Sequence, residues 1–150
     1  MDFEEKHQMI LKVKRLDPRA TLPTYATEGS AGLDLYALED VYLWFADPTS
    51  LRTGIAVEIP LGYEGQLRGR SGLAFKFGVV APHIGTIDSD YRGEINVLLQ
   101  PAHYQGQYNV KAGERIAQLI LAPVARVEVV ESDSLSETAR GKGGFGSSGR

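Results

Sequence analysis

The clearest β-strand pattern in this chain is Ile55-Ala-Val57-Glu-Ile59-Pro60-Leu-Gly62. Apolar residues stand at every second position, and the run stops at a proline and a glycine two positions later. A period of two places alternate side chains on opposite faces of a β-strand, and Pro and Gly are residues of turns. The stretch therefore predicts a half-buried strand followed by a turn.

Similar short runs recur along the whole chain. They cover residues 11–14, 94–99, 116–121 and 127–130, and Pro101 and Pro123 follow two of them. No stretch has the longer period of an extended amphipathic helix, and a short helix is expected only over Gly72–Lys76, with Ser71 as its N-cap. The pattern predicts an all-β sandwich or barrel.

Composition limits the classes of protein that fit. The chain has 150 residues, enough for one domain with a core, and a net charge of −3, which argues against a general nucleic-acid or membrane binder. It has no cysteine, which excludes disulfides and thiolate metal sites. The acidic beginning lacks the apolar stretch of a signal peptide, and no apolar run is long enough to span a bilayer. We therefore expect a cytoplasmic protein.

The final stretch, Arg140–Arg150, has a composition unlike the rest. It carries five glycines, three cations, two serines and Phe145. Glycines let backbone N–H groups approach a ligand closely, and Arg, Lys and Ser bind phosphate. The stretch predicts a flap over a nucleotide with Phe145 on the base; a disordered basic terminus is the alternative. We expect a β domain over residues 1–132 and a linker with this flexible arm over 133–150.

Two further blocks place charge near glycine. Ala31–Ala37 holds Asp34 inside an apolar pattern, where a carboxylate must be paired. It is either a functional acid or a turn aspartate or structural ion pair. Gly69–Lys76 offers Arg70 and Ser71 at the expected helix start, a combination that suits an anion. An ordinary capped turn explains that block equally well.

The remaining two blocks combine polar groups with strands. Gly85–Glu94 contains Asp88 and Asp90, and a tight turn between them would leave one carboxylate free to act as a base. Its alternative is a β-hairpin rich in turn formers. Gly113–Leu121 has Gln118 inside an apolar strand, so its amide should find a partner unless it lies on an edge strand.

Together, in this order and at this spacing, the five blocks resemble the homotrimeric dUTP pyrophosphatase (dUTPase) family over about residues 22–149. The resemblance implies a distorted jelly-roll β-barrel or sandwich with one short helix, and a homotrimer whose active sites are shared between chains. It implies hydrolysis of dUTP to dUMP and pyrophosphate, which keeps uracil out of DNA and supplies dUMP for dTMP synthesis. It also implies Mg²⁺ held mainly by the triphosphate and water, without direct protein ligands.

The resemblance also implies a role for each matching residue. Asp88 matches the carboxylate that activates the attacking water, Tyr91 the aromatic that excludes a 2′-hydroxyl, and Asp34 an acid that supports the water shell of the metal. Arg70, Ser71 and Gly72 would reach the active site from a neighbouring chain, and the arm would reach it from a third chain. The implied substrate-binding residues are Arg70, Ser71, Gly72, Pro82, Gly85, Thr86, Ile87, Tyr91, Asn96, Gln118, Arg140, Phe145, Gly146, Ser147 and Ser148.

One position departs from the family pattern, and two rival functions remain open. Pro82 stands where many members of the family have Asn, so contacts to uracil from that side are not assigned, and His83 beside it receives no role. A deaminase resembling dCTP deaminase would use a proton-shuttling glutamate, for which Glu94 is the candidate. A non-enzymatic nucleotide-binding trimer would show damage at Asp88, Arg70 or the arm, and none is visible.

Overall fold

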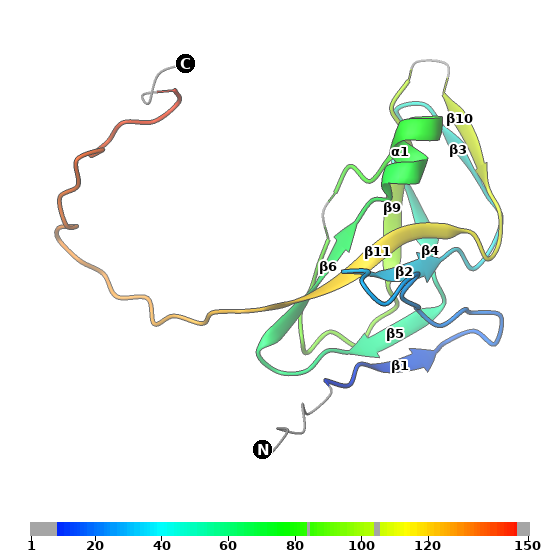
Figure 1. Ribbon diagram of the computed structural model, residues 1–150, viewed down its shortest axis with the longest axis horizontal. Coiled ribbons are helices and arrows are strands. Elements are labelled where there is room, and N and C mark those ends of the chain that lie inside the picture. The colour runs from blue at the N-terminus through cyan, green and yellow to red at the C-terminus, as the bar shows by residue number, and fades with distance from the viewer. Residues whose placement is uncertain (1–8, 84, 104–105, 147–150) are drawn as a thin grey trace.

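The computed structural model describes residues 9–83, 85–103 and 106–146. Within these residues the chain forms eleven short strands and one helix (Figure 1). Their bounds are β1 Lys12–Arg15, β2 Leu33–Tyr36, β3 Val41–Trp44, β4 Thr49–Arg52, β5 Ile55–Glu58, β6 Tyr63–Arg68, α1 Ser71–Phe77, β7 Val79–Val80, β8 Thr86–Ile87, β9 Asn96–Pro101, β10 Gln107–Val110 and β11 Arg115–Pro123.

The strands form four small antiparallel sheets. The largest has the order β2-β11-β6-β8, and the others are β4-β9-β7, β1-β5 and β10-β3. Most neighbours in these sheets are far apart along the chain, which is the arrangement of a jelly roll rather than of a simple meander. The expected all-β fold with a single short helix is confirmed for the described residues.

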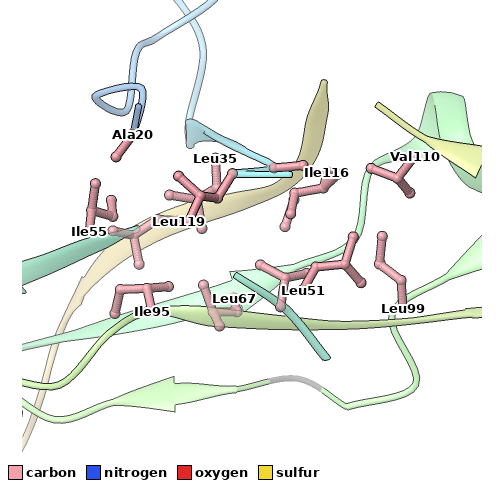
Figure 2. Packing of buried hydrophobic residues seen from close by; sticks show 14 of the residues in the cluster. Ala20, Leu35, Leu51, Ile55, Leu67, Ile95, Leu99, Val110, Ile116 and Leu119 are labelled. Atoms are coloured by element: carbon pink, nitrogen blue, oxygen red, sulfur yellow. The ribbon is translucent and has the colours of Figure 1, made fainter. Parts of the chain in front are cut away.

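The core lies between the sheets. In β5, Ile55 and Val57 are buried and Glu58 is exposed, and Ile59 is buried after the strand ends. Figure 2 shows side chains from β2, β4, β5, β6, β9, β10 and β11 meeting in one apolar cluster. Its members with no more than 1 % exposure include Leu35, Leu43, Leu51, Ile55, Val79, Ile95, Leu99, Val110, Ile116 and Leu119.

The helix begins one residue earlier than expected and is capped differently. Arg70, in an extended conformation with no side-chain capping bond, is the N-cap, so the prediction that Ser71 caps the helix is wrong. An arginine side chain has no acceptor for the helix N–H groups, and that of Arg70 is bound elsewhere, as described below. At the other end Gly78 has φ +65°, and its N–H donates to the carbonyls of Leu73 and Ala74.

One expected strand is absent. Val127–Val130 forms no strand, and Val127, Val129 and Val130 are 80, 91 and 73 % exposed. The alternation is real, but a strand needs a partner, and none of the described strands of this chain lies beside it. After β11 the described chain runs away from the sheets as an extended arm (Figure 1). No helix in the described ranges has the length and apolar character that crossing a membrane requires.

Candidate active site

The segment Gly85–Glu94 is called here the hairpin because the chain turns at Asp88–Tyr91, although its strand β8 pairs with β6 and not within the segment. It is held at its first end by the largest sheet. Ile87 pairs with Gly65 of β6, and Thr86 pairs with Gln66. A Cβ on Gly65 would lie 2.8 Å from Ile59 and 3.1 Å from the Cβ of Ile87, so only glycine admits this approach. The buried Ile87 side chain therefore fixes the strand that leads directly into Asp88.

A tight turn follows. The N–H of Tyr91 donates to the carbonyl of Asp88 at 3.1 Å, and the guanidinium of Arg92 donates to the carbonyls of Ser89 and Tyr91 at 2.7 and 2.9 Å. These bonds close the turn and leave the Asp88 side chain exposed to solvent. The expected tight turn is therefore present and Asp88 is exposed, whereas the divergence of the two carboxylates stays a prediction, because Asp88 and Asp90 are both exposed.

The inner face of this hairpin lines a pocket of about 300 Å³. Six of the expected site residues meet there: Gly85, Thr86, Ile87, Asp88, Tyr91 and Asn96. Pro82 is exposed beside it and is not part of its lining among the described residues. Four polar residues that the sequence analysis did not assign also line it, namely Ser50, Arg68, His83 and Glu94.

Asp88 stands between two hollows. It also lines a second, larger hollow of about 670 Å³, together with Asp90 and residues 124–127 at the base of the arm. A ligand group in the first pocket could therefore extend past Asp88 into the second. An exposed carboxylate at such a junction can reach a water molecule that approaches the ligand from either side.

Tyr91 folds back over its own hairpin. Its hydroxyl donates to the carbonyl of Glu94 at 3.1 Å, and 44 % of the residue is exposed. A Cβ on Gly93 would lie 2.3 Å from the tyrosine hydroxyl oxygen, so glycine is required for the ring to take this position. The ring thus forms a wall of the pocket with its edge fixed by one hydrogen bond.

Asp34, Arg70 and Arg115 form a separate charged cluster, called here the arginine–aspartate cluster. Asp34 is 2 % exposed, with Arg115 Nη1 3.3 Å from one carboxylate oxygen and Arg70 Nε 3.8 Å from the other. Arg70 also donates to the carbonyl of Arg115 at 3.1 Å. The structural ion pair, one of the two interpretations of Asp34, is therefore present, and Arg115 is a member that the sequence analysis missed.

Gln118 lies next to this cluster. It is paired in register with Asp34 of β2 on one side and Arg68 of β6 on the other, so the edge-strand alternative is wrong. The expected hydrogen-bond partner of its half-buried amide is not found among the described residues. The N–H groups of Ser71 and Gly72 lie in the first turn of α1, where helical N–H groups have no partner within the helix.

The arm holds its expected site residues away from both the pocket that Asp88 lines and the arginine–aspartate cluster. Arg140 Nε donates to the carbonyl of Gly143 at 2.8 Å, and the N–H of Gly143 donates to the carbonyl of Arg140 at 3.0 Å. Phe145 is fully exposed and adopts a left-handed φ of +49°, followed by Gly146 at +92°. Ser147 and Ser148 lie outside the described residues. Beyond residues 124–127 at its base, the described part of the arm lines neither hollow of its own chain.

Comparison with known proteins decides the family. The profile of the dUTPase family matches residues 18–149, nearly the whole chain. The chain belongs to the dUTPase family. Among the relatives of this dUTPase, the deoxyuridine 5′-triphosphate nucleotidohydrolase of Nautilia profundicola is 50 % identical over 143 residues, 95 % of this chain and all of the relative. The Hydrogenobaculum protein of the same name is 51 % identical over 143 residues, 94 % of this chain and 99 % of its own.

Solved structures agree with the dUTPase assignment. A mutant dUTPase of Staphylococcus bacteriophage 80alpha, solved with dUpNHpp, superposes with a TM-score of 0.88 at 31 % identity, covering 94 % of this chain and 99 % of that one. A mutant dUTPase of phage phi11 of S. aureus, described with a structural Mg(II) ion, gives 0.78 at 26 % identity, covering 83 and 97 %. The expected family and the jelly-roll fold are confirmed, and with them the classification as a dUTP diphosphatase.

Proposed function

We propose that this dUTPase hydrolyses dUTP to dUMP and pyrophosphate with Asp88 as the general base. The observation that carries the proposal is the hairpin that places the Asp88 carboxylate and the Tyr91 ring on the wall of one pocket. The named activity of the relatives supports the substrate, as does the dUpNHpp bound by the phage enzyme.

The chemical step needs only one protein base. Asp88 takes a proton from a water molecule as the water oxygen bonds to the α-phosphorus, and the bond from that phosphorus to the bridging oxygen breaks. Pyrophosphate carries away the electron pair, and dUMP remains. A carboxylate exposed to solvent can accept this proton when the water lies within hydrogen-bond reach.

Base and sugar are recognised by the same hairpin. The backbone of Gly85–Ile87, with Asn96 on the facing strand, is proposed to bind the edge of uracil through fixed N–H and C=O groups. Cytosine would present a donor where an acceptor is needed and leave buried groups unpaired, which can cost on the order of 10⁴-fold in kcat/KM. Tyr91 is proposed to pack under the deoxyribose, where its ring leaves no room for a 2′-hydroxyl.

The phosphates are proposed to meet residues of other chains in a homotrimer. Arg70, Ser71, Gly72 and Gln118 do not line the pocket that Asp88 lines within the described part of one chain. A site shared between copies would bring them to the phosphates, with Arg140 and Phe145 of the arm closing from a third chain. Asp34 would then hold Arg70 and Arg115 in place for the anion.

The donor chemistry of the chain suits a cation that arrives with its substrate. Both oxygens of Asp34 face arginines, and among the described residues no group of three His, Cys, Asp or Glu could hold a metal ion. We propose that Mg²⁺ is bound by the triphosphate and water. The expected contact of Asp34 with the water shell of the metal does not fit its burial, and Asp34 would act on the bound anion only through Arg70 and Arg115. The ion would offset the negative charge that grows on the phosphates.

In the cell, hydrolysis of dUTP would keep uracil out of DNA and supply dUMP for dTMP synthesis. These roles place the enzyme with nucleotide metabolism in the cytoplasm, without nucleic-acid or membrane partners. The net charge of −3 supports that proposal, because binding of a nucleic-acid backbone needs a positive surface.

The test measures pyrophosphate and ammonia release, with Mg²⁺, from dUTP, dCTP, dTTP and UTP side by side. Pyrophosphate from dUTP alone is the expected result. Ammonia from dCTP would instead assign the chain to the deaminase branch. Binding of dUTP without any turnover would make the chain a nucleotide-binding protein on the scaffold of an enzyme.

A further inference from the structure

The hairpin ends at a charged side chain that the proposed chemistry does not use. The carboxylate of Glu94 accepts a hydrogen bond from the N–H of Gly54 at 2.8 Å, and both its oxygens lie 3.2 Å from Nε of Arg52. The Glu94 side chain is 20 % exposed, whereas that of Arg52 is 46 % exposed. A mostly buried carboxylate with a backbone and a charged donor is held in one place.

The backbone beside Glu94 is attached to the same segment. The N–H of Ile95 donates to the carbonyl of Ile55 at 2.9 Å, and the hydroxyl of Thr53 donates to the carbonyl of Ile95 at 2.6 Å. Thr53 and Ile95 are both buried. Gly54 has φ +72°, and a Cβ there would lie 2.9 Å from Leu38, so this turn is fixed as well. These bonds therefore restrict the backbone at Glu94.

The position of the Tyr91 ring depends on the backbone at Glu94. Its hydroxyl donates to the carbonyl of Glu94, and its ring passes over Gly93, which has no side chain to obstruct it. Because much of the ring is exposed, packing alone does not fix it. A shift of the Glu94 carbonyl would consequently shift the hydroxyl and the ring edge.

Asp88 is anchored from the other end of the hairpin. The pairing of Ile87 with Gly65 holds it to β6, whereas Tyr91 is tied through Glu94 to the turn between β4 and β5. A change at Glu94 is therefore expected to move Tyr91 more than Asp88. Substrate selection should respond to it more than the rate of the chemical step.

We propose that Glu94 is a positioning residue that sets Tyr91 for the discrimination of deoxyribonucleotides from ribonucleotides. The inference rests on the proposed function, in which the Tyr91 ring packs under the deoxyribose. With the carboxylate removed, the segment loses its bonds to Arg52 and Gly54 and keeps those made by Ile95, so the Glu94 carbonyl and the ring edge gain part of their freedom, and a 2′-hydroxyl finds more room. Although Glu94 lines the pocket, its carboxylate is bound to Gly54 and Arg52, and in this proposal it acts through Tyr91 and touches no reacting atom.

The test compares kcat/KM for dUTP and UTP in the full-length protein and in Glu94→Ala, Glu94→Gln and Tyr91→Phe. Glu94→Ala should lower the dUTP-to-UTP ratio by about tenfold, as expected for losing one buried hydrogen bond to a charged group. The kcat for dUTP should stay within about threefold, a change equivalent to half a hydrogen bond. Glu94→Gln should recover most of the ratio, because its amide oxygen can accept from Gly54.

A double-mutant cycle separates positioning from general damage. Glu94→Ala combined with Tyr91→Phe should lower the ratio no further than Tyr91→Phe alone, since both remove one interaction. Glu58 on β5 is the matched control, because its carboxylate also pairs with a cation, Lys12, at 3.4 Å. Glu58→Ala should leave the ratio unchanged. An unchanged ratio in Glu94→Ala, or additive effects in the cycle, would overturn the inference.

Two measurements keep the inference testable if a variant folds poorly or turnover is absent. Arg52→Ala removes an exposed partner only and should lower the ratio in the same direction but less; no change in it would count against the inference. Affinities for dUpNHpp and its ribose counterpart, measured by calorimetry, should show the same loss of preference. If the unmodified protein does not hydrolyse dUTP, the proposed function fails, and these affinities still decide the role of Glu94.

Discussion

Asp88 and Asp90 are two positions apart on one turn, yet of the two only Asp88 lines the pocket of about 300 Å³. Asp88→Asn should keep dUTP binding and lower kcat by about 10²–10⁴-fold, the usual contribution of a general base. Asp90→Asn is the matched control and should change kcat little. Steady-state kinetics with calorimetric binding measures both, and a near-normal kcat for Asp88→Asn would remove the general-base assignment.

Tyr108 shows how one half-buried group makes stability depend on pH. Burial first, and then the hydrogen bond to Glu114, raise the pKa of Tyr108 from 10.0 to about 12. The folded state holds this proton more tightly than the unfolded chain, so the stabilisation is complete below pH 10 and lost as the pH rises toward 12. Tyr108→Phe should remove that part of the alkaline loss.

Tyrosinate absorbance provides the measurement for Tyr108. The folded unmodified protein should show a tyrosinate step near pH 12, and this late step should be missing from Tyr108→Phe. A late step that persists in the variant would assign it to another tyrosine. The free energy of unfolding, measured with denaturant, should fall more between pH 9 and pH 11 in the unmodified protein than in Tyr108→Phe.

The residue types of the site could be predicted from the sequence, but their pairings could not. The cost of burying Asp34 in a strand already demanded a partner, and the structure supplies two. Those partners lie 36 and 81 positions along the chain, a distance that no local pattern spans. Glu94 was missed as a positioning residue for the same reason, because its donors come from the end of β4 and from the turn that follows it.

At the scale of elements, Gly78 is the position where the helix depends most on one residue. Its φ is +65°, and a Cβ there would lie 2.4 Å from the ring of His103. Gly78→Ala should lower the free energy of unfolding by about 1–3 kcal/mol, from the left-handed conformation and the displaced ring. Gly29→Ala, with open space around it and no positive φ, should change it little. Chemical denaturation measures both, and equal effects would contradict the explanation.

The strands show where period-two patterns succeed and where they fail. The runs around β1, β5, β9 and β11 were predicted because their apolar faces meet the core. The two-residue strands β7 and β8 are too short to carry a period, and their pairing depends on β9 and β6. Val127–Val130 has the pattern of a strand, but pattern alone cannot supply the neighbour that its backbone needs.

At the scale of the molecule, the arm should be dispensable for folding and required for activity. The described residues of the arm contribute nothing to the buried core. Deleting residues 140–150 should therefore preserve the circular dichroism spectrum and the oligomeric state, and reduce turnover of dUTP to a very low level. Full activity in the truncated protein would remove the arm from the mechanism.

Mixed oligomers test whether sites are shared. Chains carrying Asp88→Asn keep an intact arm, and arm-deleted chains keep Asp88, so a mixture should regain part of the activity if sites are built across copies. Subunit exchange is verified first, with differently tagged chains. Verified exchange without any recovery would indicate that each chain contains a complete site.

The place of β11 in the largest sheet bears on how the protein is made. β11 lies between β2 and β6, yet the ribosome synthesises it after both of them. Until residues 115–123 leave the exit tunnel, those strands have no common neighbour, and a nascent chain leaves apolar side chains such as Leu35 and Leu67 without their cover.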